Sequence, residues 1–245
     1  MHHGQNERSF SRQDSEDLMT PTVVLVHGAF TDTGSWAGVI RRLQAAGITA
    51  KAVATPLRGL AHDAAFVAGT VAAIDDPVVL VGNSYAGAVI GAAAPQMSNV
   101  NALVHIAAFV PDEGESVLEM AANFPDSELG PNLRAIGDDF YLSTEGFRRV
   151  LAEDLPEDVT SLLAVSQRPI AAVALGEKSG PVGWRTLPSW HAVASADKAI
   201  HPTVQRFGAQ RAGSTVVEID GSHLLALSQA DTVTDLILEA AAKTS

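Results

Sequence analysis

Apolar residues form two alternating kinds of pattern along the chain. Short runs rich in apolar and β-branched residues predict strands at 23–26, 48–54, 78–81, 102–107, 190–194 and 215–219. Longer stretches with apolar residues at helical spacing predict helices at 36–46, 61–74, 85–97, 203–211 and 231–241. Continuously apolar runs are typical of strands buried on both faces. The alternation therefore predicts an α/β fold with a mostly parallel sheet flanked by helices.

The alternation fails between about residues 111 and 188. Pro and Gly divide this stretch into short pieces with helical spacing, at 116–122, 144–152 and 157–165. Residues 112–161 contain 13 acidic and 3 basic residues, so most of the formal net charge of −12 lies here. We expect a small helical cap inserted at about 111–188 into a single domain that spans residues 21–245.

Composition narrows the class of protein. The chain has 245 residues, 47% of them hydrophobic, and can bury a large core, which excludes a disordered or fibrous protein. It has no cluster of Lys and Arg that could bind nucleic acid or an anionic membrane surface, so we expect neither partner. The absence of cysteine excludes disulfides, a thiolate nucleophile and Cys-ligated zinc, and it fits a cytoplasmic location.

The first 20 residues differ from the rest of the chain. Residues 1–20 are polar and charged and lack the apolar stretch of a secretion signal, so we expect a flexible N-terminal leader. No apolar run elsewhere reaches the roughly 18 residues that span a bilayer.

A candidate nucleophile follows the third expected strand. Ser84 lies in Gly82-Asn83-Ser84-Tyr85-Ala86-Gly87, directly before an expected helix. A tight strand-to-helix turn that exposes a serine hydroxyl requires small residues two positions before and two positions after the serine, because larger side chains would collide with the strained backbone. Gly82 and Ala86 occupy these positions. A second Gly-x-Ser sequence ends at Ser116, but it follows no strand and fits a helix capping box with Glu119.

The segment after the first expected strand is a candidate oxyanion hole. In His27-Gly28-Ala29-Phe30, a glycine-turned loop can aim the Ala29 N–H at the same point as the Tyr85 N–H. Both groups could then stabilise a developing oxyanion. We interpret His27 as a structural residue of this loop.

A serine nucleophile needs a base, and the base needs an orienting acid. Of the eight histidines, His223 follows the last expected strand and lies at the same sheet edge as Ser84. Asp197 follows the strand at 190–194 and is the favoured acid. Asp112, which follows the fourth expected strand, is the alternative.

Four motifs together resemble the α/β-hydrolase superfamily. They are His27-Gly28-Ala29, Gly82 to Gly87 around Ser84, Ser195-Ala196-Asp197-Lys198 and Gly221-Ser222-His223. The order Ser84, Asp197, His223 is also that of the superfamily. The similarity is greatest to the branch that holds small bacterial esterases, plant methyl esterases and hydroxynitrile lyases. It implies an α/β-hydrolase fold with a cap.

Two positions distinguish esterases from lyases within this branch. The lyases carry Thr at the position of Gly28 and Lys directly after the catalytic histidine, where this chain has Leu224. A pocket without that ammonium favours acyl transfer. No HExxH pattern, His–carboxylate cluster or phosphate-binding glycine loop is present, so we expect no metal and no cofactor.

The sequence therefore predicts a serine hydrolase that cleaves a carboxylic ester of a small, mostly neutral molecule. Ser84, Asp197 and His223 would form the triad, with Ala29 and Tyr85 in the oxyanion hole. The residues expected to line the substrate pocket are Phe30, Phe109, Phe124, Tyr141, Trp184 and Leu224. A lactonase, an amidase, a C–C bond hydrolase or a ligand-binding protein on the same scaffold remain alternatives. Either a monomer or a homodimer fits the sequence.

Overall fold

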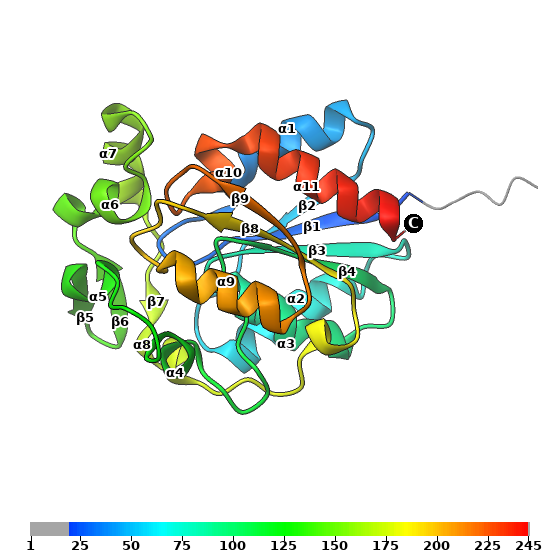
Figure 1. Ribbon diagram of the computed structural model, residues 1–245, viewed down its shortest axis with the longest axis horizontal. Helices are drawn as coiled ribbons and strands as arrows, with labels where there is room; N and C mark the ends of the chain where they lie inside the picture. Colours follow the sequence, from blue (N-terminus) through cyan, green and yellow to red (C-terminus); the bar gives the residue numbers. More distant parts are fainter. Residues whose placement is uncertain (1–19, 245) are drawn as a thin grey trace, which may run out of the picture.

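The computed structural model describes residues 20–244, so nearly all of the expected leader lies outside the described residues. Its centre is a six-stranded sheet in the order β2-β1-β3-β4-β8-β9, with every neighbouring pair parallel (Figure 1). The strands are β1 Thr22–Val26, β2 Ala50–Val53, β3 Val78–Asn83, β4 Val100–Ile106, β8 Ser189–Ala194 and β9 Thr215–Ile219. This confirms the expected fold class, and each strand begins and ends within two residues of its expected bounds.

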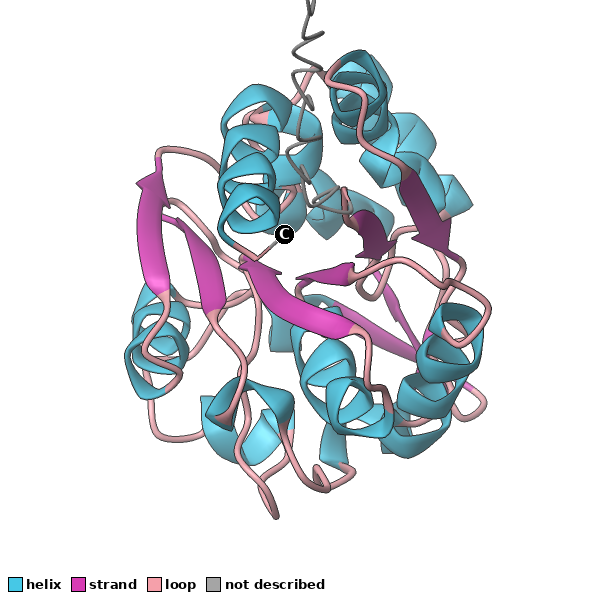
Figure 2. Cartoon of the chain, turned by 90° about the vertical axis from the view of Figure 1, so that its right-hand side faces the viewer, coloured by secondary structure: helices cyan, strands magenta, loops and turns pink. Residues whose placement is uncertain are grey.

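Helices cover both faces of this sheet (Figure 2). On one face, α1 (Ala37–Ala45) and α11 (Ala230–Lys243) pack on one apolar cluster, and on the other, α2 (Leu60–Val71) and α3 (Ala86–Ala93) pack on a second. The helix α9 (Pro202–Arg211) packs against β8. Short helical turns accompany these helices: η1 Thr33–Trp36, η2 Ala94–Gln96, η3 Gly183–Arg185 and α10 Leu225–Ser228. The helix expected at 85–97 ends early, because Pro95 cannot continue α3 and the chain tightens into η2.

The segment between β4 and β8, residues 107–188, is called here the inserted segment. Most of this segment lies beyond one end of the sheet, on the left of Figure 1, whereas its last part, which contains η3, contacts α3. Its elements are α4 Val117–Ala121, α5 Leu129–Asn132, β5 Leu133–Ile136, β6 Asp139–Leu142, α6 Thr144–Leu151, α7 Glu157–Ser166, β7 Ile170–Ala171 and α8 Ala172–Gly176. The expected capping box is present, with reciprocal hydrogen bonds between Ser116 and Glu119.

The inserted segment also contains an antiparallel three-stranded sheet, β5-β6-β7, that the sequence analysis did not anticipate. The turn between β5 and β6 passes through Gly137, whose φ of 61° is a conformation that glycine adopts without strain. These strands are four residues long or shorter, and only β5 is mostly exposed, so none is long enough to show the apolar alternation that reveals a strand.

Within the described residues, no helix combines the length and apolar character needed to cross a membrane.

Candidate active site

Ser84 occupies a strained turn between β3 and α3. Its φ of 60° lies in the left-handed region, which non-glycine residues rarely adopt. A side chain at Gly82 would place its Cβ 2.5 Å from the carbonyl oxygen of Ala86, so the turn requires glycine there. The Ser84 N–H donates to the Ile106 carbonyl at 3.1 Å, and the Ser84 carbonyl accepts from the N–H of Phe109 at 3.2 Å. The end of β4 thus holds the turn, as expected for a nucleophile at the end of a strand.

The loop after β1 lies directly against Ser84. A Cβ on Gly28 would come within 2.7 Å of both the Asn83 carbonyl oxygen and Ser84 Cβ, and within 3.3 Å of Ser84 Oγ. In the described part of the chain, the backbone N–H groups of Ala29 and Tyr85 have no hydrogen-bond acceptor. Two free N–H groups that flank a nucleophile are suited to bind an oxyanion.

Buried side chains support this loop and the turn. His27 is fully buried, and its Nδ1 lies 2.9 Å from the Gly28 carbonyl oxygen. Burial lowers the pKa of His27, so its imidazole stays neutral. The Tyr85 hydroxyl donates to the buried Asp63 carboxylate at 3.0 Å. Burial, with the charge of Asp63 next, raises the pKa of the Tyr85 phenol, so it remains a donor.

His223 and Asp197 form a buried pair at the ends of β9 and β8. His223 Nδ1 lies 2.7 Å from Asp197 Oδ2, and both side chains are almost inaccessible to solvent. The N–H groups of Ala199 and Ile200 donate to Asp197 Oδ1 at 2.7 and 2.9 Å. With Nδ1 directed at the carboxylate, Nε2 of His223 is left to exchange a proton. Neither this Nε2 nor the Ser84 hydroxyl makes a hydrogen bond within residues 20–244.

Gln205 is a further polar residue of this site that the sequence analysis missed. It is fully buried on α9, and its Nε2 donates to Asp197 Oδ2 at 2.7 Å and to the Ile200 carbonyl at 2.8 Å. Its Oε1 accepts from the Ala194 N–H at 2.9 Å. A glutamine among the buried positions of an expected helix was the available signal.

The inserted segment holds the loop that carries His223. The Leu151 carbonyl accepts from the Ser222 hydroxyl at 3.1 Å and from the Leu224 N–H at 3.0 Å. The Asp154 carboxylate accepts from both the N–H and the hydroxyl of Ser222. These bonds fix the residues on either side of His223 and involve Asp154, which the sequence analysis did not single out.

Asp112, the alternative acid, is engaged elsewhere. Its carboxylate accepts from both Nε and Nη2 of Arg185 at 2.7–3.0 Å. Desolvation raises the pKa of Asp112, but hydrogen bonds from Arg185 and from the Glu113 N–H, together with the charges of Arg185 and Arg211, lower it by more in sum, so the pKa is lowered overall. Asp112 is therefore paired with Arg185, and the carboxylate that contacts His223 is that of Asp197.

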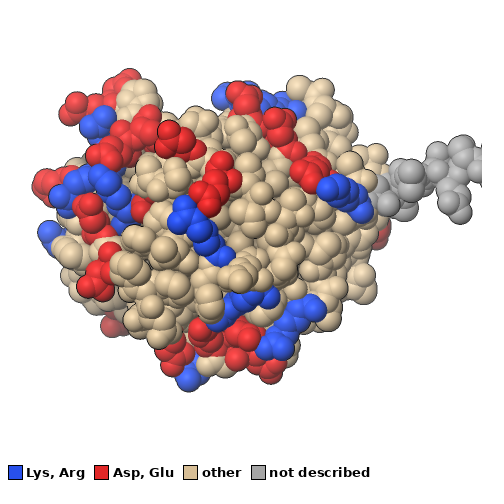
Figure 3. Space-filling model, in the orientation of Figure 1, with Lys and Arg blue, Asp and Glu red and all other residues tan. Residues whose placement is uncertain are grey.

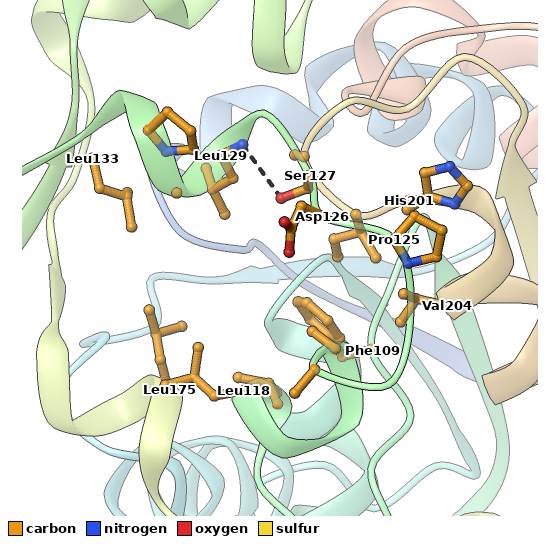
Figure 4. Close-up of a pocket in the computed structure, with 17 residues that line it drawn as sticks. Phe109, Leu118, Pro125, Asp126, Ser127, Leu129, Leu133, Leu175, His201 and Val204 are labelled. Atoms are coloured by element: carbon orange, nitrogen blue, oxygen red, sulfur yellow. Dashed lines mark hydrogen bonds between the residues drawn. The ribbon is translucent and has the colours of Figure 1, made fainter.

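An apolar cavity of about 370 Å³ lies between the inserted segment and the start of α9 (Figure 4). Phe109 lines it, but the other five residues expected to line a pocket do not. Phe30 and Leu224 pack in the core cluster of α2 and α3, and Phe124 packs against Phe207. Trp184 is buried and donates from Nε1 to the Pro111 carbonyl, while Tyr141 lies on β6. Of the residues expected to line the substrate pocket, this cavity thus involves Phe109 alone.

Residues 20–244 contain no group of three or more His, Cys, Asp or Glu side chains arranged to hold a metal ion.

Comparison with known proteins identifies the class. Residues 23–236 match the model of the alpha/beta hydrolase family, and the chain belongs to that family. A search of curated protein sequences finds no match.

Solved structures share the fold. A pyrethroid hydrolase from Sphingobium faniae JZ-2 has a TM-score of 0.76 at 19% identity, over 91% of this chain and 97% of that one. Polyneuridine aldehyde esterase has a TM-score of 0.73 at 20% identity, over 90% and 98% of the two chains. A methylesterase from Arabidopsis has a TM-score of 0.74 at 17% identity, over 91% and 99%.

Proposed function

We propose that this protein is a cofactor-independent serine hydrolase that cleaves carboxylic esters. The observation that carries the proposal is the arrangement around Ser84: a serine held at positive φ, flanked by two backbone N–H groups without acceptors. A buried His–Asp pair at the same sheet edge supplies the proton-transfer partner. The family match supports hydrolysis, and the three similar structures are named as a pyrethroid hydrolase, a polyneuridine aldehyde esterase and a methylesterase.

In the proposed first step, Ser84 Oγ attacks the ester carbonyl carbon while Nε2 of His223 takes the hydroxyl proton. The carbonyl oxygen becomes an oxyanion and accepts hydrogen bonds from the N–H groups of Ala29 and Tyr85. Asp197 stabilises the imidazolium that forms. The missing hydrogen bond between Ser84 and His223 fits this scheme, because such bonds often form only when substrate binds.

The tetrahedral intermediate then collapses to an acyl-enzyme. The bond from the carbonyl carbon to the leaving oxygen breaks, and His223 gives its proton to that oxygen, which leaves as an alcohol. Water then attacks the acyl-enzyme carbonyl carbon as His223 takes its proton; the bond from that carbon to Ser84 Oγ breaks, His223 returns the proton to Oγ, and the carboxylic acid is released. In this proposal the inserted segment acts as a cap over the substrate.

The proposal is tested with a panel of p-nitrophenyl esters from acetate to decanoate, with lactone and anilide counterparts. We expect the esters to be the best substrates and Ser84→Ala to lower kcat on the order of 10⁶-fold without loss of fold. Circular dichroism and thermal unfolding check the fold of the variant. Turnover by Ser84→Ala at the wild-type rate, with contaminating esterase excluded, would refute the assignment of the nucleophile.

A further inference from the structure

The apolar cavity is not lined by Ser84, Asp197 or His223 themselves, but some of its lining residues are hydrogen-bonded to Ser84 and Asp197. One wall is Phe109, whose N–H is bonded to the Ser84 carbonyl. Another is formed by Ala199 and Ile200, whose N–H groups are bonded to the Asp197 carboxylate. A molecule bound in the cavity therefore lies next to the segments that hold Ser84 and Asp197.

The cavity walls are almost entirely apolar. Leu118 of α4, Leu133 of β5, Leu175 of α8 and Val204 of α9 face it together with Phe109 (Figure 4). Burying apolar surface against such walls yields about 25 cal/mol per Å². A volume of about 370 Å³ lies within the range of pockets that hold compact organic ligands, roughly 300–1,000 Å³. The walls thus favour a bulky apolar group.

One charged side chain interrupts this apolar lining. Asp126 is the only Asp, Glu, Lys or Arg that lines the cavity, and its carboxylate points inward (Figure 4). Within residues 20–244 it has no hydrogen-bond or ion-pair partner. The only other titratable group of the lining, His201, directs Nδ1 to the Thr203 hydroxyl at 2.8 Å. The Asp126 carboxylate is therefore a hydrogen-bond acceptor with no donor in the described part of the chain, at the edge of the apolar cavity.

The acids nearest to Asp126 in the sequence on either side, Glu119 and Glu128, do have basic partners. Glu119 pairs with Lys178 at 3.2 Å, and Glu128 pairs with Arg149 at 3.1 Å. Acidic and basic side chains are interspersed on the face shown in Figure 3. Asp126 itself is exposed and forms no ion pair within residues 20–244, while Lys198 and Arg206 line a neighbouring cavity that it also borders. Its charge faces whatever enters the apolar cavity.

We infer that the cavity selects esters whose apolar portion carries a cationic nitrogen. The carboxylate of Asp126 provides the counter-charge, and the ring of Phe109 provides an aromatic face of the kind that attracts quaternary ammonium groups. The excess of acidic over basic residues at 112–161 also favours a cationic substrate over a neutral or anionic one. This inference rests on the proposed ester hydrolase function and assigns its substrate class.

The kinetic test compares two esters of butyric acid that differ in charge and hardly in shape. One is the choline ester, and the other is the 3,3-dimethylbutyl ester, in which a carbon replaces the cationic nitrogen. We expect kcat/KM of the wild-type protein to be about three- to tenfold higher for the choline ester at low salt. The preference should shrink as salt is raised, because Asp126 is exposed enough to be screened. In Asp126→Asn the ratio should fall to about one.

Asp158→Asn serves as the matched control. Asp158 is an exposed acid of α7 that does not line the cavity, so the variant changes net charge equally and should keep both the ratio and the rate. A ratio of one in the wild-type protein, or a preference that persists in Asp126→Asn, would overturn the inference.

A binding measurement separates this inference from the proposed function. Calorimetric titration with phenyltrimethylammonium needs no hydrolysis, and we expect weaker binding to Asp126→Asn than to the wild-type and Asp158→Asn proteins. Binding that depends on Asp126 without hydrolysis of any ester would support the cation site and refute the esterase. Hydrolysis that depends on Ser84, with phenyltrimethylammonium binding equally well to all three proteins, would refute the cation site alone.

Discussion

The Asp154 carboxylate accepts hydrogen bonds from both the backbone N–H and the hydroxyl of Ser222, the residue before His223. Asp154 follows α6 in the inserted segment, whereas Ser222 follows the last strand of the sheet. The same segment contributes Glu153, which pairs with Lys198 at 2.6 Å, next to Asp197. The inserted segment therefore fixes the loops of both the proposed base and the proposed acid.

We predict that Asp154→Asn lowers kcat about tenfold and changes KM by less than twofold. Hydrogen bonds to a charged group contribute roughly 1.5–3 kcal/mol, and the amide can accept only one of the two bonds from Ser222. Steady-state kinetics with a p-nitrophenyl ester, with thermal unfolding of each variant, measures the effect. Glu145→Gln, an exposed acid on α6, is the control and should behave as wild type. Equal kcat values for Asp154→Asn and Glu145→Gln would contradict the role of Asp154 in positioning His223.

The two candidate acids should respond very differently to amide substitution. Asp197→Asn should lower kcat on the order of 10⁴-fold, because His223 would lose the carboxylate that orients its tautomer and stabilises the imidazolium. Asp112→Asn only weakens the contact with Arg185, so we expect less than a threefold change. Steady-state kinetics of both variants with the same ester shows which substitution lowers kcat more. A larger loss of kcat in Asp112→Asn than in Asp197→Asn would exclude Asp197 as the acid.

Two glycines offer a matched pair of substitutions. In Gly28→Ala the new Cβ would collide with Asn83 and Ser84, so we expect kcat to fall by at least 10²-fold as the oxyanion loop is displaced. Gly69 lies in α2 with open space around it, and Gly69→Ala should keep full activity. Alanine should also stabilise that helix by about 0.5–1 kcal/mol. Activity assays and thermal unfolding test both, and a fully active Gly28→Ala would show that the loop tolerates displacement.

A buried histidine pair should make stability depend on pH. His105 and His191 lie opposite each other on β4 and β8, with ring centroids 5.6 Å apart, and none of their ring nitrogens has a partner within the described chain. Burial lowers the pKa of His105 to about 4, and it lowers the pKa of His191 well below its usual value. In the unfolded chain these histidines bind protons near pH 6.5, whereas in the folded chain they stay neutral at that pH. The free energy of unfolding is therefore highest above about pH 6.5 and decreases as the pH falls toward 4.

Urea unfolding at several pH values between 4.5 and 7.5 measures this dependence. At about 1.4 kcal/mol per pH unit, His105 alone destabilises the fold on the order of 3 kcal/mol by pH 4. His105→Leu removes this titration and an unsatisfied polar group, so we expect a shallower pH dependence and no loss of stability at pH 7.5. An unchanged pH dependence in His105→Leu would show that other groups cause the acid sensitivity.

Much of the fold and part of the candidate site could be predicted from the sequence. The central strands were predictable because burial on both faces of a parallel sheet leaves a continuous apolar run, as at Val78–Val81. Ser84 was predictable because its turn admits only small neighbours, a local restriction that leaves a motif. The position of Asp197 and His223 after consecutive strands places them at one sheet edge, and their 2.7 Å contact agrees with that placement.

Which polar side chains support the candidate site, and which residues line the cavity, could be identified only from the tertiary structure. Asp154 and Ser222 are 68 residues apart, and the partners Gln205 and Asp197 come together only when α9 packs beside β8. No sequence pattern pairs Asp154 with Ser222, because a hydrogen bond between distant segments requires no particular spacing, and the buried glutamine on an expected helix gave no indication of its partner. The cavity was unpredictable for the same reason: Phe109 lines it while Trp184 packs in the core, although both are apolar aromatic residues. Local patterns thus determined the main elements and the turn that holds Ser84, the proposed nucleophile, whereas tertiary packing determined which side chains support the candidate site and which face the cavity.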